Sequence, residues 1–289
     1  MAVGPMGRVY LSEDGGRTFK QLGIKPLLAE AERKWHEATK GNSVSPSQME
    51  RLAPLPIWKL ALDPQSPTDG RTLYAATAVG IYKTTDGGRT WNESSQGMTP
   101  SSDIHHLVIN PKDPTTLYAA WGHRAEGEPP YGLYRSMDAG RNWTLPAPDK
   151  IGPVWSLSLC TGFPMTLYVI ANEPRKSGGT WIKPKLWRTD DGGHSWRLVD
   201  ERRGACVAVH PMDPERVYYA TFAFDLNAER TGFWGSCDGG RHGQEIGVDI
   251  PLSCPMKAIL FDYADPSRFF LLNGFCVYEG RDLGAPRGR

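Results

Sequence analysis

Aspartate has the most regular spacing of any residue type in this sequence that could do chemistry. Asp14, Asp86, Asp138, Asp191 and Asp238 each follow a serine or threonine by two residues and precede a Gly-Gly or Ala-Gly pair. A carboxylate in that position can accept hydrogen bonds from the backbone N–H groups of its own turn. Metal binding is the alternative, yet each segment offers one carboxylate, whereas Ca²⁺ takes about six to eight oxygen ligands. The pattern therefore predicts structural turns and no metal site.

Histidine and cysteine could form a second kind of site. His105 and His106, with His123 and Cys206, carry the donor types that zinc prefers. Adjacent residues of a regular strand point to opposite faces of the sheet, so His105 and His106 cannot both bind one ion. Structural or solvated histidines are therefore favoured. The cysteines are odd in number and lack C-x-x-C spacing, which favours reduced thiols; they are Cys160, Cys206, Cys237, Cys254 and Cys276.

Carboxylates outside the turns raise the hypothesis of glycoside hydrolysis. That reaction needs a pair of carboxylates about 5–9.5 Å apart. The candidate carboxylates lie in predicted loops and are Asp225, Glu173, Glu126 and Glu128. Nothing in the sequence shows that any two of them lie at that distance from one another. The glycine pairs do not predict a nucleotide site, because no strand–G-x-G-x-x-G–helix context surrounds them. We therefore assign no catalytic residue and expect no cofactor.

The aspartate segments are parts of a longer repeat. The first four end in an aromatic residue, and the fifth carries glycine instead; the aromatic residues are Phe19, Trp91, Trp143 and Trp196. A second motif alternates with the first, as in Trp58–Pro64 followed by Thr72–Ala76. Successive aspartates are 72, 52, 53 and 47 residues apart, and an insertion at 24–52 lengthens the first interval. The remaining period is that of a four-stranded propeller blade, about 40–50 residues.

These motifs place four strands in each repeat. In the second repeat we expect strands at 58–63, 72–77 and 80–84 and a fourth from Trp91. The aspartate then sits at the turn between the third and fourth strands, the glycine pair supplies positive φ, and the aromatic residue packs between adjacent sheets. The sequence predicts an all-β fold, a single β-propeller domain over residues 1–289 with about five four-stranded blades. The termini would share one blade; six blades, with a partial N-terminal one, are the alternative.

The pattern S/T-x-D-x-G-x-T/S-W, as in Thr84–Trp91, resembles the Asp-box or BNR repeat of sialidases, xyloglucan-cleaving endoglucanases, sortilin-type receptors and photosystem II assembly factors. The resemblance covers nearly the whole chain and implies a β-propeller. It does not select a function, because these relatives include hydrolases, receptors and assembly factors. A sialidase-like site would imply a triad of arginines, and the inner strands carry no clean triad.

The resemblance also implies that ligands bind on the face opposite the aspartate turns. That face carries the starts of the inner strands and the loops between second and third strands, where loop length varies most. The candidate binding residues there are Trp35, Trp58, Lys59, His105, His106, Trp121, His123, Arg124, Tyr131, Trp155, Arg175, Trp181, Arg230 and Lys257. The alternative is that these aromatic and polar residues only fill the mouth of a tapering channel.

The insertion at 24–52 carries helix signals. Pro26 suits the first position of a helix. An apolar stripe follows at helical spacing, formed by Leu27, Leu28, Ala31 and Trp35. The stripe either packs on the propeller as a lid or leaves Trp35 exposed as an anchor for a partner.

Charge and composition narrow the choice of partner. Lys and Arg total 33 and Asp and Glu total 32, so bulk electrostatics give no reason to expect nucleic acid. No segment approaches the ~20 apolar residues of a membrane helix, and the first residues lack a signal-peptide pattern. We therefore expect no membrane insertion and a cytoplasmic protein. Two functions remain: a non-catalytic scaffold that holds a protein partner through the loop face, or a small glycan-acting hydrolase or lectin.

Overall fold

The computed structural model describes residues 2–3, 9–12, 14, 17–21, 57–99, 103–121, 132–147, 150–173, 183–221, 232–246, 256–262, 264–273 and 276–282. The chain divides into two compact units, Met1–Ala125 with Tyr134–Leu145, and Glu126–Leu133 with Pro146–Arg289. All regular elements among the described residues are β-strands, as the repeat predicts. The helical insertion predicted at 24–52 lies outside them. Over the same residues, no helix has the length and apolar character needed to cross a membrane.

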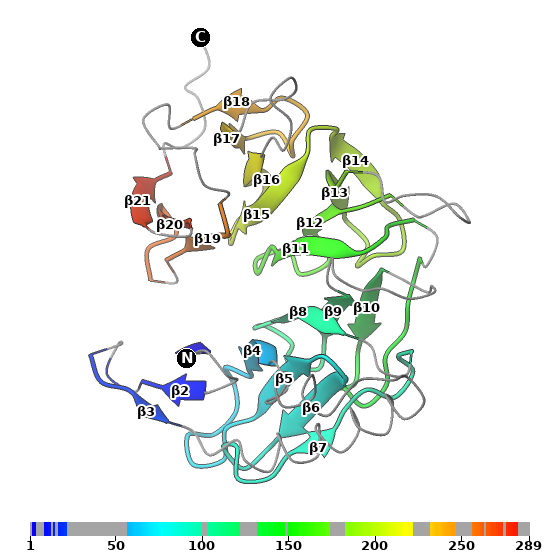
Figure 1. The fold of residues 1–289 in the computed structure, drawn as a ribbon, viewed down its shortest axis with the longest axis vertical. Coiled ribbons are helices and arrows are strands. Elements are labelled where there is room, and N and C mark those ends of the chain that lie inside the picture. Colours follow the sequence, from blue (N-terminus) through cyan, green and yellow to red (C-terminus); the bar gives the residue numbers. More distant parts are fainter. Residues whose placement is uncertain are drawn as a thin grey trace, which may run out of the picture. The chain divides into compact units, whose positions relative to one another are not determined.

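The first unit holds three antiparallel sheets whose strands follow chain order (Figure 1). The N-terminal sheet contains β1 (Ala2–Val3), β2 (Val9–Leu11) and β3 (Lys20–Gln21). The next contains β4 (Ile57–Leu62), β5 (Leu73–Thr77), β6 (Gly80–Thr84) and β7 (Asn92–Glu93). The third contains β8 (Ile104–Ile109), β9 (Leu117–Trp121) and β10 (Leu133–Ser136), the last starting at the boundary between the units.

The second unit also holds three antiparallel sheets. Its first sheet contains β11 (Val154–Leu159), β12 (Leu167–Ala171), β13 (Lys185–Thr189) and β14 (Arg197–Asp200). The second contains β15 (Gly204–His210), β16 (Asp213–Thr221), β17 (Gly232–Ser236) and β18 (Gln244–Glu245). The last contains β19 (Ala258–Phe261), β20 (Arg268–Leu272) and β21 (Val277–Arg281).

The strands of the second repeat lie where the sequence predicts them, within one residue at each end of β4 to β6. β1 gives the N-terminal segment a third strand, and β21 does the same for the C-terminal segment, so each forms a three-stranded sheet of its own. That the termini share one blade, with six blades as the alternative, stays a prediction.

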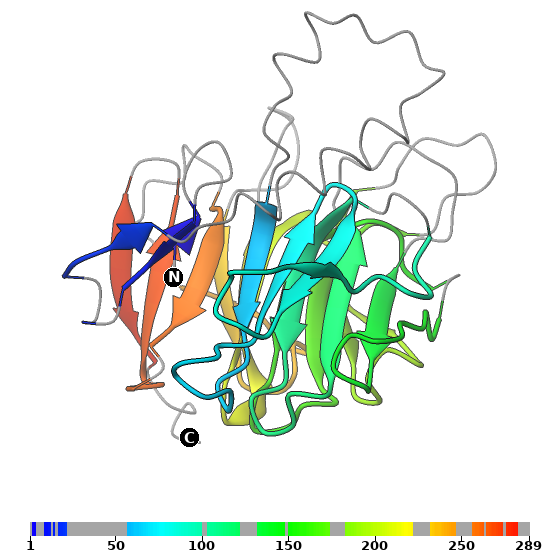
Figure 2. The ribbon, with the colours of Figure 1, turned by 90° about the horizontal axis from the view of Figure 1, so that it is seen from below.

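The second strand is the core of its sheet in three of the repeats. Every residue of β5, β9 and β12 is buried. Strands that are covered on both faces are expected to be continuous apolar runs rather than alternating ones, and the repeated Leu-Tyr-Ala-Ala sequence has that character. Figure 2 shows β4, β5 and β6 (blue to cyan) side by side in the first unit, with β5 between its two neighbours.

Each aspartate turn is closed by the aspartate itself. In the second repeat, Asp86 Oδ1 accepts hydrogen bonds from Thr90 N–H at 2.9 Å and from the Thr84 hydroxyl at 2.7 Å, and Oδ2 accepts the Thr90 hydroxyl at 2.6 Å. The same backbone bond, at 2.9 Å, recurs at Asp14, Asp138, Asp191 and Asp238. The predicted role of the five aspartates as acceptors within their own turns is what the structure shows.

The two residues after the aspartate adopt positive φ in all four turns where both are described. Gly87 and Gly88 have φ of 74° and 95°, which a glycine tolerates because it lacks Cβ. The third turn has alanine first, and Ala139 takes a φ of 59°. Such a conformation costs about 1–2 kcal/mol in a residue with a side chain, so Ala139 is a strained position that the turn enforces.

The aromatic residue after the turn is buried in two of the four predicted cases. Trp91 and Trp143 are 8% and 3% exposed, whereas Trp196 is half-buried and Phe19 is 55% exposed. The tryptophans are fixed by their indole N–H groups, which donate to Gly88 O, Ser94 O and Gly193 O. The prediction of a core position is wrong for Phe19, because its side chain lies largely exposed.

Removing an aspartate should destabilise its turn. Burial raises the pKa of Asp191, but hydrogen bonds from Ser195 and Thr189 outweigh it and lower the pKa to about 2. We expect Asp191→Ala to lower the free energy of unfolding by about 1–2 kcal/mol, because turn N–H groups lose their acceptor. The exposed Asp69 lies outside the turns, and Asp69→Ala is the control, expected to have no effect in urea unfolding.

The same carboxylate predicts a dependence on pH. The folded pKa of Asp191 lies below the unfolded value, so its contribution to stability is present above about pH 4 and is lost as the pH falls toward 2. In Asp191→Asn, the free energy of unfolding should therefore decline less between pH 5 and pH 2.5 than in the wild type. Equal declines in both proteins would contradict this role.

Ala139→Gly should stabilise the protein by about 0.5–1 kcal/mol, since glycine relieves the positive φ at a smaller entropic cost. Gly87→Ala is the matched reverse change: a Cβ there meets no atom within 4 Å, so any loss comes from φ alone. Thermal melting of both variants measures the two effects. A lower melting temperature for Ala139→Gly would contradict the strain.

Candidate functional site

Four of the inner strands begin with a bulge that redirects one side chain. In the pairing of β4 with β5, Ile57 faces Thr77 and Lys59 faces Ala76, so Trp58 is the extra residue. The same shift occurs at the starts of β8, β11 and β15, where the extra residues are His105, Trp155 and Ala205. Bulges are common beside binding sites because they redirect a side chain. The regular alternation assumed for His105 and His106 therefore does not hold at this position.

In the first unit, two of these bulged residues meet. The rings of Trp58 and His105 lie 4.1 Å apart between centroids, at an angle of 30°. Asp103 links them, since Trp58 Nε1–H donates to Oδ1 at 2.7 Å and His105 Nε2 lies 3.0 Å from Oδ2. Because the carboxylate accepts from both rings, it holds them in one arrangement, named here the Trp58 platform. Trp58 remains 37% exposed, so the fixed ring is open to solvent.

The second unit has one bulged aromatic residue. Trp155 is half-buried, and its Nε1–H donates to the Asn172 side-chain oxygen at 2.8 Å. Asn172 itself is 5% exposed. The other inner strand of this unit that begins with a bulge places Ala205 there, whose side chain offers no polar group. Trp155 is therefore held by a neutral amide, whereas Trp58 is held by a carboxylate.

The remaining predicted residues differ in exposure. Lys59 and Lys257 are exposed and His106 is half-buried. Surrounding protein lowers the pKa of Lys59 by desolvation, although the side chain still reaches solvent. Trp121 is 7% exposed, so the structure assigns it to the core rather than to a binding face. Seven candidates lie outside the described residues: Trp35, His123, Arg124, Tyr131, Arg175, Trp181 and Arg230.

The described residues contain no group of three or more His, Cys, Asp or Glu side chains placed to hold a metal. Cys206 is 2% exposed, and burial raises the pKa of its thiol to about 12. A protonated thiol is a poor metal ligand and a poor nucleophile. Among the carboxylates considered for hydrolysis, Glu173 forms an ion pair with Lys185, whose Nζ lies 2.7 Å from Glu173 Oε1. Asp225, Glu126 and Glu128 lie outside the described residues.

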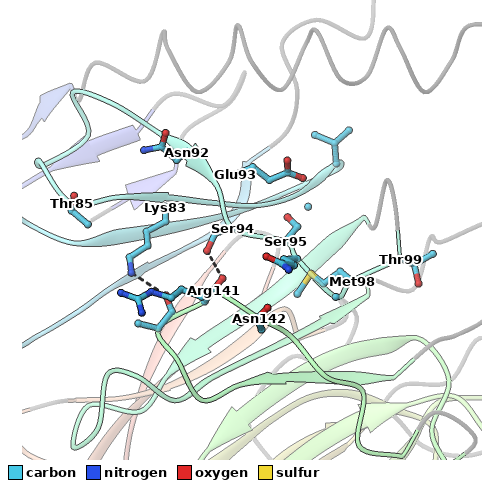
Figure 3. A pocket seen from close by; sticks show the side chains of 16 residues that line it. Lys83, Thr85, Asn92, Glu93, Ser94, Ser95, Met98, Thr99, Arg141 and Asn142 are labelled. Carbon is cyan, nitrogen blue, oxygen red and sulfur yellow. Dashed lines mark hydrogen bonds between the residues drawn. The ribbon is translucent and has the colours of Figure 1, made fainter.

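A cavity of about 1030 Å³ opens in the first unit, and no residue of the Trp58 platform lines it (Figure 3). One wall is the segment from Asn92 to Thr99, and the facing wall is the third aspartate turn, Ala139–Asn142. Lys83 and Arg141 enter it from the two sides. The Ser94 hydroxyl donates to Gly140 O at 2.6 Å and joins the walls.

Sequence reasoning missed Asp103, Lys83 and Arg141. Asp103 stands two residues before His105, and no other inner strand has an aspartate at that place, so the repeat gave no signal. Lys83 lies in a predicted strand and Arg141 in an aspartate turn, so the repeat accounts for both as structure. A residue-by-residue comparison of the repeats would have found them, because their neighbours change from one repeat to another.

Asp103→Ala should free the indole of Trp58. Hydrogen exchange of the Trp58 Nε1–H, followed by nuclear magnetic resonance, is expected to accelerate about tenfold or more once its acceptor is lost. The indole N–H of Trp155, which donates to Asn172, is the internal control and should keep its rate. Unchanged exchange at Trp58 would show that Asp103 does not hold the platform.

No family model matches this chain. A stretch of 80 residues, 27% of the chain and 9% of the relative, is 36% identical to a xyloglucanase of Hypocrea jecorina (strain QM6a). The match thus spans about a tenth of that relative's length.

Two solved structures share the fold. The GH74 xyloglucanase from Xanthomonas campestris has a TM-score of 0.59 at 21% identity, over 79% of this chain and 37% of its own. The GH74 enzyme of Niastella koreensis has a TM-score of 0.62 at 18% identity, over 96% of this chain and 41% of its own. These likenesses, with the repeated antiparallel sheets, show that the chain has a β-propeller fold.

Proposed function

We propose that this β-propeller binds a neutral glycan chain at the Trp58 platform. The carrying observation is the exposed indole that Asp103 and His105 fix in place. A pyranose ring has one face of C–H groups and a rim of hydroxyls. The indole face can pack against the C–H groups, and nearby polar groups can form hydrogen bonds with the hydroxyls. A ring held before the ligand arrives loses little conformational entropy on binding, which favours affinity.

Sequence likeness supports the same class of ligand. The matched relative from Hypocrea jecorina is named for its action on xyloglucan, a neutral polysaccharide. The match covers a small part of that enzyme, so the proposal is limited to binding. We also infer that the five aspartate turns are Asp-box repeats, because their hydrogen bonds recur at each turn.

The proposal does not include hydrolysis. Both oxygens of Asp103 are engaged by Trp58 and His105, so this carboxylate is occupied as a positioning group. Glycoside cleavage requires a second carboxylate across the bond. Glu173, the one described member of the predicted set, is paired with Lys185.

A protein partner is the second candidate. An exposed tryptophan on an ordered element is often the anchor of an interface, and Trp58 has that exposure. Under this hypothesis the platform would receive an apolar side chain of the partner. The insertion at 24–52 stays a proposed part of that surface.

Calorimetric titration with xyloglucan oligosaccharides tests the glycan proposal. We expect saturable binding to the wild type, and Trp58→Ala should weaken it about tenfold or more. Phe19→Ala removes another exposed aromatic residue of the same unit and should leave affinity unchanged. Absence of binding to several neutral oligosaccharides would reject a glycan ligand and leave the protein partner. Release of reducing ends would instead identify a hydrolase.

A further inference from the structure

The repeat places two cations at the same positions in both units. Lys83 stands directly before the hydroxyl residue of its aspartate turn, and Arg188 does so in the second unit. Arg141 follows Asp138 by three residues, as Arg241 follows Asp238. Each strand cation also lies over the tyrosine of its own second strand, Lys83 at 5.1 Å and Arg188 at 5.3 Å from the ring centroid. The two pairs are therefore structural equivalents.

In the second unit a glutamate neutralises both cations. Arg188 Nη2 lies 2.6 Å from Glu215 Oε1, and Arg241 Nη1 lies 3.9 Å from Glu215 Oε2. Asp190 supplies a further carboxylate oxygen at 2.7 Å from Arg188 Nη2. Two cations and two carboxylates thus meet at this junction between neighbouring sheets.

In the first unit both carboxylates are replaced by threonine. Backbone bonds fix the equivalence, since Gly239 N–H donates to Glu215 O at 2.7 Å and Ala139 N–H donates to Thr115 O at 2.8 Å. Thr115 therefore stands where the second unit has Glu215. Thr85 follows Thr84 as Asp190 follows Thr189, so it occupies the place of the aspartate.

Lys83 and Arg141 consequently have no carboxylate within ion-pair distance among the residues that the structure describes. The Lys83 ammonium donates to Ala139 O at 2.9 Å, which leaves further N–H donors. Burial lowers the pKa of Lys83, and the nearby Arg141 charge lowers it further, while the Asp63 and Asp138 charges partly offset this. Both cations line the 1030 Å³ cavity, and Figure 3 shows their ends converging.

We propose that this cavity binds an oxyanion between Lys83 and Arg141, in the place that the Glu215 carboxylate fills in the second unit. The ligand group is a carboxylate, sulfate or phosphate, whose oxygens can accept from both cations. The site is separate from the Trp58 platform and does not depend on the glycan proposal.

The rest of the cavity indicates what the oxyanion is attached to. Beyond the two cations, half of the lining residues carry a hydroxyl or carboxamide group, including Asn92, Ser95 and Asn142, and the others include Val79 and Met98. Glu93 also lines it and disfavours a second negative charge on the ligand. A singly charged, hydroxylated molecule such as a sugar acid fits this lining, and a bare inorganic anion fits the cation pair alone.

Calorimetric titration at constant ionic strength, with glucuronate, acetate, sulfate and phosphate as probes and glucose as the uncharged control, tests the proposal. We expect saturable binding of at least one oxyanion and none of glucose. Tighter binding of glucuronate than of acetate supports a hydroxylated acid as the ligand, and equal affinities support the charge alone. No saturable binding of any probe overturns the site.

Variants that restore the missing carboxylate sharpen the test. Thr115→Glu should abolish oxyanion binding, because the new side chain occupies the position of Glu215, whereas the neutral Thr115→Gln should keep it. Arg141→Gln should weaken binding at least fivefold. Circular dichroism and melting confirm that each variant is folded. If Thr115→Glu does not fold, the affinity of Arg141→Gln alone tests the proposal. Oxyanion affinity equal to that of the wild type, in folded Thr115→Glu or in folded Arg141→Gln, overturns the proposal.

Discussion

The structure depends on one hydrogen bond, from a backbone N–H to the aspartate carboxylate four residues earlier. That bond holds two consecutive residues at positive φ and so fixes the direction of their carbonyl groups. In the third turn, Ala139 O then accepts from Tyr74 and Lys83 of the preceding sheet, and Gly140 O accepts from Ser94. Neighbouring sheets of the first unit are thus joined through carbonyl groups that the turn has oriented.

A second constraint acts at the opposite end of the inner strands. Each bulge adds one residue without a partner, and the extra side chain no longer follows the alternation of the strand. In the first unit this brings Trp58 and His105 together, with Asp103 able to reach both rings. The turns therefore hold the sheets together, while the bulges redirect single side chains: Trp155 and Ala205 pack against the cores of the second unit, and Trp58 lies exposed.

The repeat predicts the strands, the buried second strands and the hydrogen bonding of the aspartates, because each has a local cause that recurs along the chain. The site is harder to predict for the same reason. Asp103 is unique to one inner strand, and a bulge depends on pairing between strands rather than on residue type. Phe19 shows the limit within the motif itself: it is apolar and stands at the aromatic position of the repeat, yet it lies exposed. The insertion at 24–52 and the long loops stay predictions.

Comparison of the repeats within one chain separates residues that build the fold from residues that can bind a ligand. A cation beside the turn recurs in both units, so stacking on tyrosine explains it as structure. Its counter-ion does not recur, although both backbones make the same bond. A partly buried cation without a carboxylate keeps N–H donors that the oxygens of a ligand can satisfy. A ligand oxyanion can therefore supply the missing negative charge at the position where the repeat departs from its own pattern.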